Sequence, residues 1–134
     1  DPALRYAWAD VNARRKPDIA GAAYTYNPND SKITTNYAID RALGVLVTQG
    51  TREGVAPAVS PNTGRLFTVG ALGLGALTDV AFDIADLNNK ALAAVRTSRD
   101  ARTRLYEVDL SSGRARLVGT VGAGTALRGL AIEP

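Results

Sequence analysis

The sequence predicts an all-β protein built from antiparallel, four-stranded, β-propeller-like blades. Short apolar runs alternate with turn residues along the chain, 13 Gly and 6 Pro are spread between them, and similar segments recur at a period of about 50 residues, which is typical of propeller blades. The 134 residues hold about two blades and the first strand of a third. Since a propeller needs about four blades to close, we expect the chain to belong to a larger ring or assembly.

The first predicted blade spans residues 21–78, after an irregular lead-in at 1–20. Its strands are expected at 21–26, 34–40, 45–49 and 64–72. Asn, Pro, Asp and Ser at 27–31 mark a turn, Gly44 supplies the positive backbone angle of a hairpin, and 50–63 form a surface loop.

The second predicted blade spans residues 79–122, with apolar strands at 77–85, 90–97, 105–110 and 115–121. Residues 127–132 are expected to be the first strand of a further blade. The alanine-rich stretch 85–105 has a helical alternative, but the turn residues inside it favour a hairpin. Asp40 and Asp109 each precede a turn, where an aspartate commonly bonds backbone N–H groups.

Two internal matches indicate the repeat. Residues 64–84 match 113–133, which places Gly70 on Gly119, and residues 36–50 match 105–119, which places Tyr37 on Tyr106. The paired glycines of 73–75 and 122–124 are read as turns between blades, because no helix follows them to form a phosphate site.

The segments AAYTYN, YAID, LFTVGALG, VAFDIA and LYEVDLSSGRARLVGTVG resemble the C-terminal half of a family of exported bacterial proteins. That family is catalogued only as a domain of unknown function and carries propeller-like repeats. The resemblance implies export to the periplasm or the cell exterior, an all-β repeat fold and a longer parent protein. It implies no activity and no catalytic residue.

The chain contains no Cys, His or Met. Disulfides, zinc–thiolate sites, thiol catalysis and a histidine general base are therefore excluded. We predict a non-catalytic binding, scaffolding or accessory assembly module without a cofactor. The alternative is a fragment of a metal-dependent propeller hydrolase or lactonase. Asp83, Asp86 and Asn88 are the oxygen ligands that a cation could use, although a solvated turn also explains them, and Asp79 shares a strand face with Asp83.

The net charge is +3, from 16 Lys and Arg against 13 Asp and Glu. Nucleic acid is not the expected partner, because the basic and acidic residues are interleaved. A face rich in arginine could bind an anionic polymer or simply be solvated. Trp8 is either a binding platform or a cover for the edge of the core. The arginines of this predicted partner surface are Arg96, Arg99, Arg102, Arg104, Arg114 and Arg116.

The expected partner is another protein, which would be the remaining half of the parent protein or a second copy of this chain. Repeat units expose apolar faces at their ends unless these are stacked or capped. No apolar run is long enough to cross a membrane as a helix.

Overall fold

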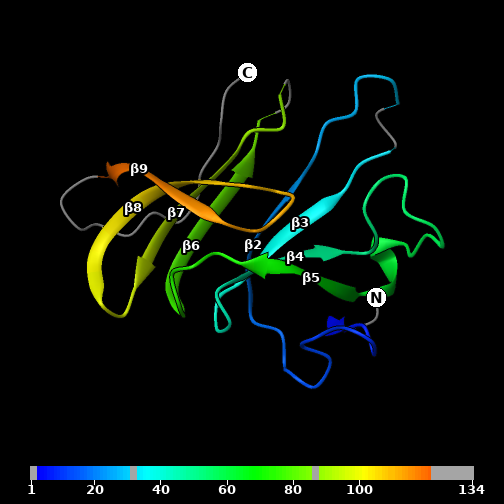
Figure 1. Cartoon of the computed structure of the whole chain (residues 1–134), viewed down its shortest axis with the longest axis horizontal. Helices are drawn as coiled ribbons and strands as arrows, with labels where there is room; N and C mark the ends of the chain where they lie inside the picture. The colour runs from blue at the N-terminus through cyan, green and yellow to red at the C-terminus, as the bar shows by residue number, and fades with distance from the viewer. Residues whose placement is uncertain (1–2, 31–32, 86–87, 122–134) are drawn as a thin grey trace.

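The computed structural model describes residues 3–30, 33–85 and 88–121 and folds them into two β-sheets (Figure 1). The first sheet has five strands in the order β1-β5-β4-β3-β2, and the second has four in the order β6-β7-β8-β9. All strand pairs are antiparallel except β1 with β5. The elements are β1 (Arg5–Tyr6), β2 (Ile19–Tyr24), β3 (Asn36–Asp40), β4 (Val45–Gln49), the 3-10 helix η1 (Pro61–Thr63), β5 (Arg65–Ala71), β6 (Leu77–Ile84), β7 (Ala91–Thr97), β8 (Asp100–Val108) and β9 (Ala115–Val121).

The predicted all-β class is confirmed, since no α-helix occurs among these described residues. The helical content of the same three ranges provides no segment long and apolar enough to cross a membrane.

The turns that follow β3 and β8 are capped as the sequence predicts. Asp40 Oδ1 accepts a hydrogen bond from the backbone N–H of Leu43 at 3.1 Å. Asp109 Oδ1 accepts one from the backbone N–H of Ser111 at 2.8 Å. In both turns the glycine four residues after the aspartate has a positive φ, which only glycine adopts without steric cost. The predicted capping role of both aspartates is confirmed.

The alanine-rich stretch 85–105 forms hairpins and not a helix. β6 pairs with β7, so that Phe82 lies opposite Ala93, and β7 pairs with β8, so that Ala93 lies opposite Tyr106. Asn89 turns the chain between β6 and β7 with a φ of 55°. Because left-handed backbone cannot continue a right-handed helix, the turn residues override the helical propensity of alanine.

The two sheets pack face to face around a shared core. Ile39 and Leu46 from the first sheet are fully buried against the second. β2 and β6 lie side by side, and a Cβ atom on Gly21 would stand only 3.1 Å from the Cβ of Phe82. The absence of a side chain at this glycine therefore permits the close approach. The buried members of the core are Ala23, Tyr37, Ile39, Leu46, Leu72, Leu77, Phe82, Ile84, Ala91, Ala93, Val95 and Val108.

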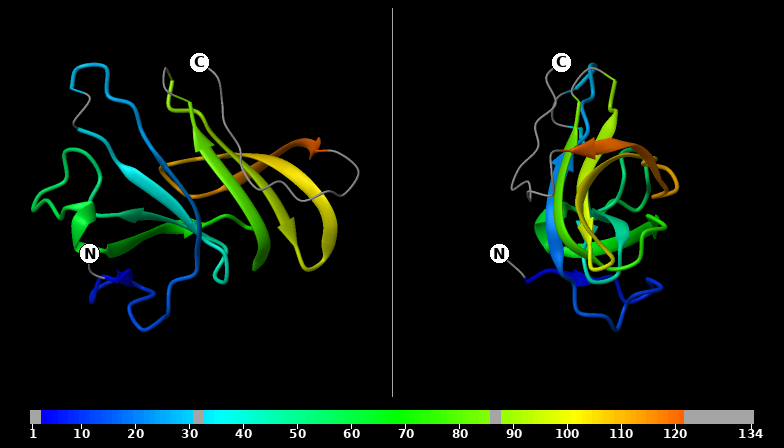
Figure 2. Two further views of the ribbon diagram at one scale, coloured as in Figure 1. Left: turned by 180° about the vertical axis from the view of Figure 1, so that it is seen from behind. Right: turned by 90° about the vertical axis from the view of Figure 1, so that its left-hand side faces the viewer.

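The other face of the first sheet buries a smaller cluster with help from the N-terminal segment. Tyr6 on β1 is buried together with Ala38, Val45, Val47 and Leu66. This segment runs along the lower edge of the first sheet, in blue in Figure 2. β1 thus extends the sheet beyond β5 and supplies a cover for its second face.

The observed boundaries differ from the predicted ones in the lead-in and between the sheets. β1 and the start of β2 lie within residues 1–20, because Ile19 already pairs with Asp40. β6 begins at Leu77, where the predicted strand 77–85 also begins, because Leu77 pairs with Thr97, so only the predicted blade boundary at residue 79 lies too late. The glycines at 122–124 and the predicted strand at 127–132 lie outside the described residues.

Candidate functional site

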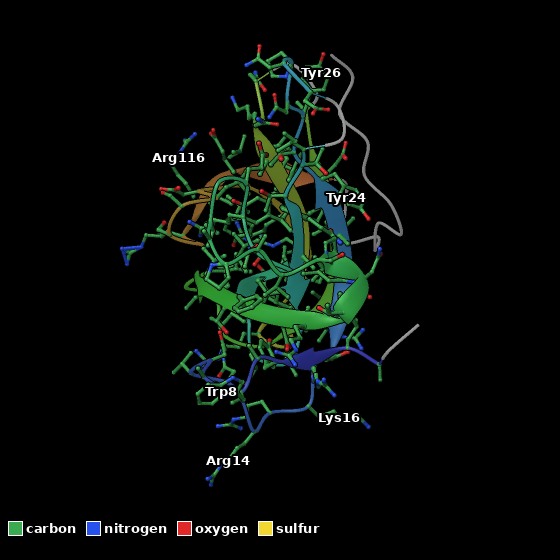
Figure 3. The ribbon with its side chains drawn as sticks, turned by 90° about the vertical axis from the view of Figure 1, so that its right-hand side faces the viewer. Trp8, Arg14, Lys16, Tyr24, Tyr26 and Arg116 are labelled. Atoms are coloured by element: carbon green, nitrogen blue, oxygen red, sulfur yellow. The ribbon has the colours of Figure 1, made fainter. Side chains whose placement is uncertain are left out.

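The segment between β1 and β2, residues 7–18, carries the two most exposed large apolar side chains of the described residues. Trp8 and Val11 are each 86% exposed. Arg14, Arg15 and Lys16 follow on the same segment and are exposed as well. Figure 3 shows that Trp8, Arg14 and Lys16 project from this segment away from the two sheets. We call residues 7–18 the Trp8 loop.

Polar side chains hold the Trp8 loop to β5. Asp10 Oδ1 accepts a hydrogen bond from the backbone N–H of Thr68 at 2.7 Å, and Asp10 Oδ2 accepts one from the Thr68 hydroxyl at 2.6 Å. Asn12 Nδ2 donates to the same Thr68 oxygen at 2.9 Å. The backbone N–H of Asn12 donates to Asp10 Oδ2 at 2.9 Å. Thr68 therefore anchors the middle of the loop by bonding the side chains of Asp10 and Asn12.

An ion pair fixes the end of the Trp8 loop at the start of β2. Nε and Nη2 of Arg41 each donate to a different carboxylate oxygen of Asp18 at 3.1 Å. This two-point contact raises the pKa of Arg41 above its ordinary value, first through the hydrogen bond and then through the charge of Asp18. Bidentate pairs of this kind fix orientation as well as distance. The chain therefore enters β2 in a defined direction.

The other end of the loop is fixed by a buried contact of Tyr6. The Tyr6 hydroxyl donates to Asp40 Oδ2 at 2.6 Å, and Asp40 is fully buried. Burial raises the pKa of Tyr6 well above its ordinary value, and the hydrogen bond to Asp40 raises it further. The hydroxyl therefore remains a neutral donor throughout the physiological range of pH.

The reading of Trp8 as a cover for the edge of the core is wrong, because its side chain is exposed. Strand alternation would place Tyr6 and Trp8 on one face, but β1 ends at Tyr6. Tyr6 is 3% exposed and fills the site beside the sheet, whereas the chain turns at Ala7 and leaves Trp8 in solvent. The alternative use of Trp8, as a binding platform, is the one that its exposure permits.

The six arginines predicted to form one surface are not brought together. Arg102 is the third residue of β8, whereas Arg116 lies on β9 and is paired with Glu107 near the other end of β8. At about 3.3 Å per residue, five residues separate them by about 17 Å. Four of the six form ion pairs with acids: Arg96 with Asp79, Arg102 and Arg104 with Asp100, and Arg116 with Glu107.

Arg114 and Arg116 line an open groove beside the turn between β8 and β9. The groove has a volume of about 670 Å³, and Glu107 and Asp109 also line it. Arg99 lines a separate groove with the loop between β5 and β6. The charges are mixed in the first groove, so it provides no uniformly basic surface for a polymer.

The described candidate metal ligands do not form a recognisable site. Asp79 pairs with Arg96 at 3.6 Å, and Asp83 lies on the same strand face. Asn88 accepts the backbone N–H of Lys90, which is a turn contact. Asp86 lies outside the described residues. Within 3–30, 33–85 and 88–121 there is no group of three or more His, Cys, Asp or Glu side chains that could hold a metal ion.

Sequence reasoning identified Trp8 but missed the rest of the loop that presents it. Val11 carries no local signal of exposure, and Thr68 lies on a distant strand. The Asp-x-Asn pattern at residues 10–12 was the available signal, since aspartate and asparagine commonly bond nearby backbone N–H groups in turns. That pattern predicts a turn, but it does not reveal which strand the turn rests on.

Comparisons with curated proteins and with solved structures gave no match. A family model described as a domain of unknown function matches residues 1–131, which is nearly the whole chain. The chain therefore belongs to the family named Domain of unknown function (DUF4394).

Proposed function

We propose that this chain is a non-catalytic, exported binding or assembly module, that its two sheets are propeller-like blades, and that the Trp8 loop is its contact surface. The single observation that carries the proposal is the exposure of Trp8 and Val11, 86% each, on a loop fixed at both ends.

The order of strands supports the reading of the sheets as blades. In each sheet four strands that are consecutive in the chain are neighbours in order, β2 to β5 and β6 to β9, and β1 is added beside β5 in the first sheet. The connection at 72–76 runs from β5 to β6, which is an edge strand of the second sheet. Neighbouring edge strands β2 and β6 then lie side by side (Figure 1). This arrangement is typical of adjacent propeller blades.

The construction of the Trp8 loop supports a role in binding. A loop pinned by Thr68 and Arg41 loses little conformational freedom when it meets a partner, so less binding energy is spent on ordering it. Tryptophan is among the residues most enriched at the energetic centres of protein interfaces. Partner binding therefore accounts for the exposed tryptophan, which does not contribute to core packing.

The composition of the loop indicates the chemistry of the partner. Trp8 and Val11 present two exposed apolar side chains, and Arg14, Arg15 and Lys16 add three positive charges on the same loop. We expect a protein surface with an apolar depression bordered by acidic residues. The hydrolase and the anionic-polymer alternatives have less support, because the described residues contain no group of acids that could hold a metal ion and four of the six arginines are ion-paired.

Site-specific photo-crosslinking tests the proposal. p-Benzoylphenylalanine is placed at position 8 in the native host, and in a matched variant at Val55, which is 47% exposed in the loop 50–63. A discrete protein adduct formed from position 8 and absent from position 55 is expected, and a second copy of this chain counts as such an adduct. Identical adducts from both positions, or none from position 8, would contradict the proposed contact surface. Fractionation of the same cells tests export, which fails if the chain remains with the cytoplasmic proteins.

A further inference from the structure

Arg5 and Arg65 occupy directly opposed positions on the parallel strands β1 and β5. The register is fixed by hydrogen bonds from Arg5 N–H to Gly64 C=O and from Ala7 N–H to Leu66 C=O, both 2.9 Å. Neighbouring strands are about 4.8 Å apart, and opposed residues project from the same face. Like charges in this arrangement are destabilising. The backbone therefore places two arginines opposite each other on one face of the sheet, where their like charges repel.

No carboxylate among the described residues neutralises this pair. Five other arginines in the same ranges do form ion pairs, whereas Arg5 and Arg65 lie opposite each other and form none. The ion-paired arginines are Arg41, Arg96, Arg102, Arg104 and Arg116.

Both arginines line a groove of about 460 Å³, together with Ser60, Thr63 and the small apolar residues 58 and 59. Ser60 Oγ accepts the backbone N–H of Asn62 at 3.1 Å, which leaves its hydroxyl proton available to donate. Thr63 Oγ1 already donates to the Ser60 carbonyl and accepts from the Arg65 N–H. The side chains that remain available to a ligand in the groove are therefore donors, two guanidinium groups and one hydroxyl.

We propose that this groove binds a tetrahedral oxyanion, a sulfate or phosphate group, between Arg5 and Arg65. Guanidinium groups match such oxygens with paired N–H donors. The groove is many times larger than the volume of about 30 Å³ that one water molecule takes up in the liquid. It therefore has room for a sulfated or phosphorylated molecule and not only for a free ion. The proposal is independent of the Trp8 loop and of the partner proposed for it.

Isothermal titration calorimetry of the whole chain with inorganic sulfate and with inorganic phosphate tests the site. The titrations are run at low ionic strength, because the screening length is about 10 Å at 0.1 M salt, with sodium chloride at matched ionic strength as the reference. Saturable binding of one oxyanion per chain is expected. Arg5→Gln and Arg65→Gln should each weaken it about tenfold or more, as expected for loss of a charged hydrogen-bond donor. Arg102→Gln, which removes the same charge far from the groove, should change it less than about twofold.

Thermal unfolding of the same variants separates ligand binding from a structural role. Without an oxyanion, Arg65→Gln should raise the unfolding temperature at low salt, because it relieves the repulsion from Arg5. Addition of sulfate or phosphate should raise the unfolding temperature of the wild type by more than that of the variant. A comparison of sulfate and phosphate with the corresponding hexose esters identifies the source, since tighter binding of an ester assigns the group to a carrier molecule and equal binding assigns it to the free ion. The proposal is overturned if the wild type shows no saturable binding, or if Arg102→Gln weakens binding as much as Arg65→Gln.

Discussion

Replacing Tyr6 by phenylalanine removes one hydroxyl from the covered face of the first sheet and leaves the ring in place. The hydroxyl donates to Asp40 at 2.6 Å, and both residues are buried, at 3% and 0% exposure. A hydrogen bond to a charged group contributes about 1.5–3 kcal/mol, and Asp40 keeps its bond from the Leu43 N–H. We therefore expect the free energy of unfolding to fall by about 2 kcal/mol. For a chain of this size the unfolding temperature should fall by about 6–8 °C.

The same variant should alter stability at alkaline pH. Burial and the bond to Asp40 raise the pKa of Tyr6, and burial raises the pKa of Tyr37. A tyrosine with a raised folded pKa contributes stability that is intact below its unfolded pKa of about 10 and is lost as the pH rises towards the folded value. Each such group can remove up to about 1.4 kcal/mol per pH unit. Tyr6→Phe should eliminate the Tyr6 part of this loss and leave only that of Tyr37.

Urea unfolding followed by far-ultraviolet circular dichroism measures both effects. Fluorescence is unsuitable, because Trp8 is already exposed in the folded chain. Tyr24→Phe is the matched control, since Tyr24 is 60% exposed and should change neither stability nor its pH dependence. The reasoning is refuted if Tyr6→Phe unfolds within about 0.5 kcal/mol of the wild type and shows the same alkaline loss.

Two further predictions concern the turn glycines and the ion pair between Asp100 and Arg104. Gly44→Ala should destabilise more than Gly54→Ala, because both glycines have positive φ but only a Cβ at position 44 would clash, 2.1 Å from the Gly75 carbonyl oxygen. Urea unfolding should show a loss of about 1–2 kcal/mol at position 54 from the backbone term and a larger one at position 44; equal losses would contradict this. Asp100 should remain ionised at pH values at which an ordinary aspartate is protonated, because the hydrogen bond from Arg104 lowers its pKa. A carboxyl NMR titration checks this, and Arg104→Gln should move the pKa of Asp100 upward.

The strand order within each sheet could be predicted because it depends on local sequence. Alternating apolar residues such as Val80 and Phe82, separated by turn residues, specify which strands are neighbours in a hairpin. The parallel pairing of Arg5 with Arg65 has no such local pattern, because the partners are far apart in the chain. The cover on the first sheet and the exposure of Trp8 both follow from this pairing. Neither could therefore be predicted from the sequence.

The segments 36–50 and 105–119 match in sequence, but they do not occupy equivalent positions in the two sheets. Tyr37 lies on β3, the second strand of its four-stranded series, whereas Tyr106 lies on β8, the third of the other. What the segments share is the aspartate-capped turn that ends in glycine. The predicted arginine surface also shows what the sequence pattern cannot predict. Alternation predicts which side of a strand a residue faces, but it does not reveal that Arg116, on β9, pairs near the end of β8 that is far from Arg102.

The glycine contacts between the two sheets decide how closely the sheets approach each other. A Cβ on Gly70 would stand 2.0 Å from the Ser112 carbonyl oxygen, and a Cβ on Gly21 would stand 3.1 Å from the Cβ of Phe82. At Gly70 the obstacle is backbone, which a side-chain rotation cannot remove. A side chain at either position would therefore push the sheets apart, and the two glycines act as spacers that keep the sheets in contact.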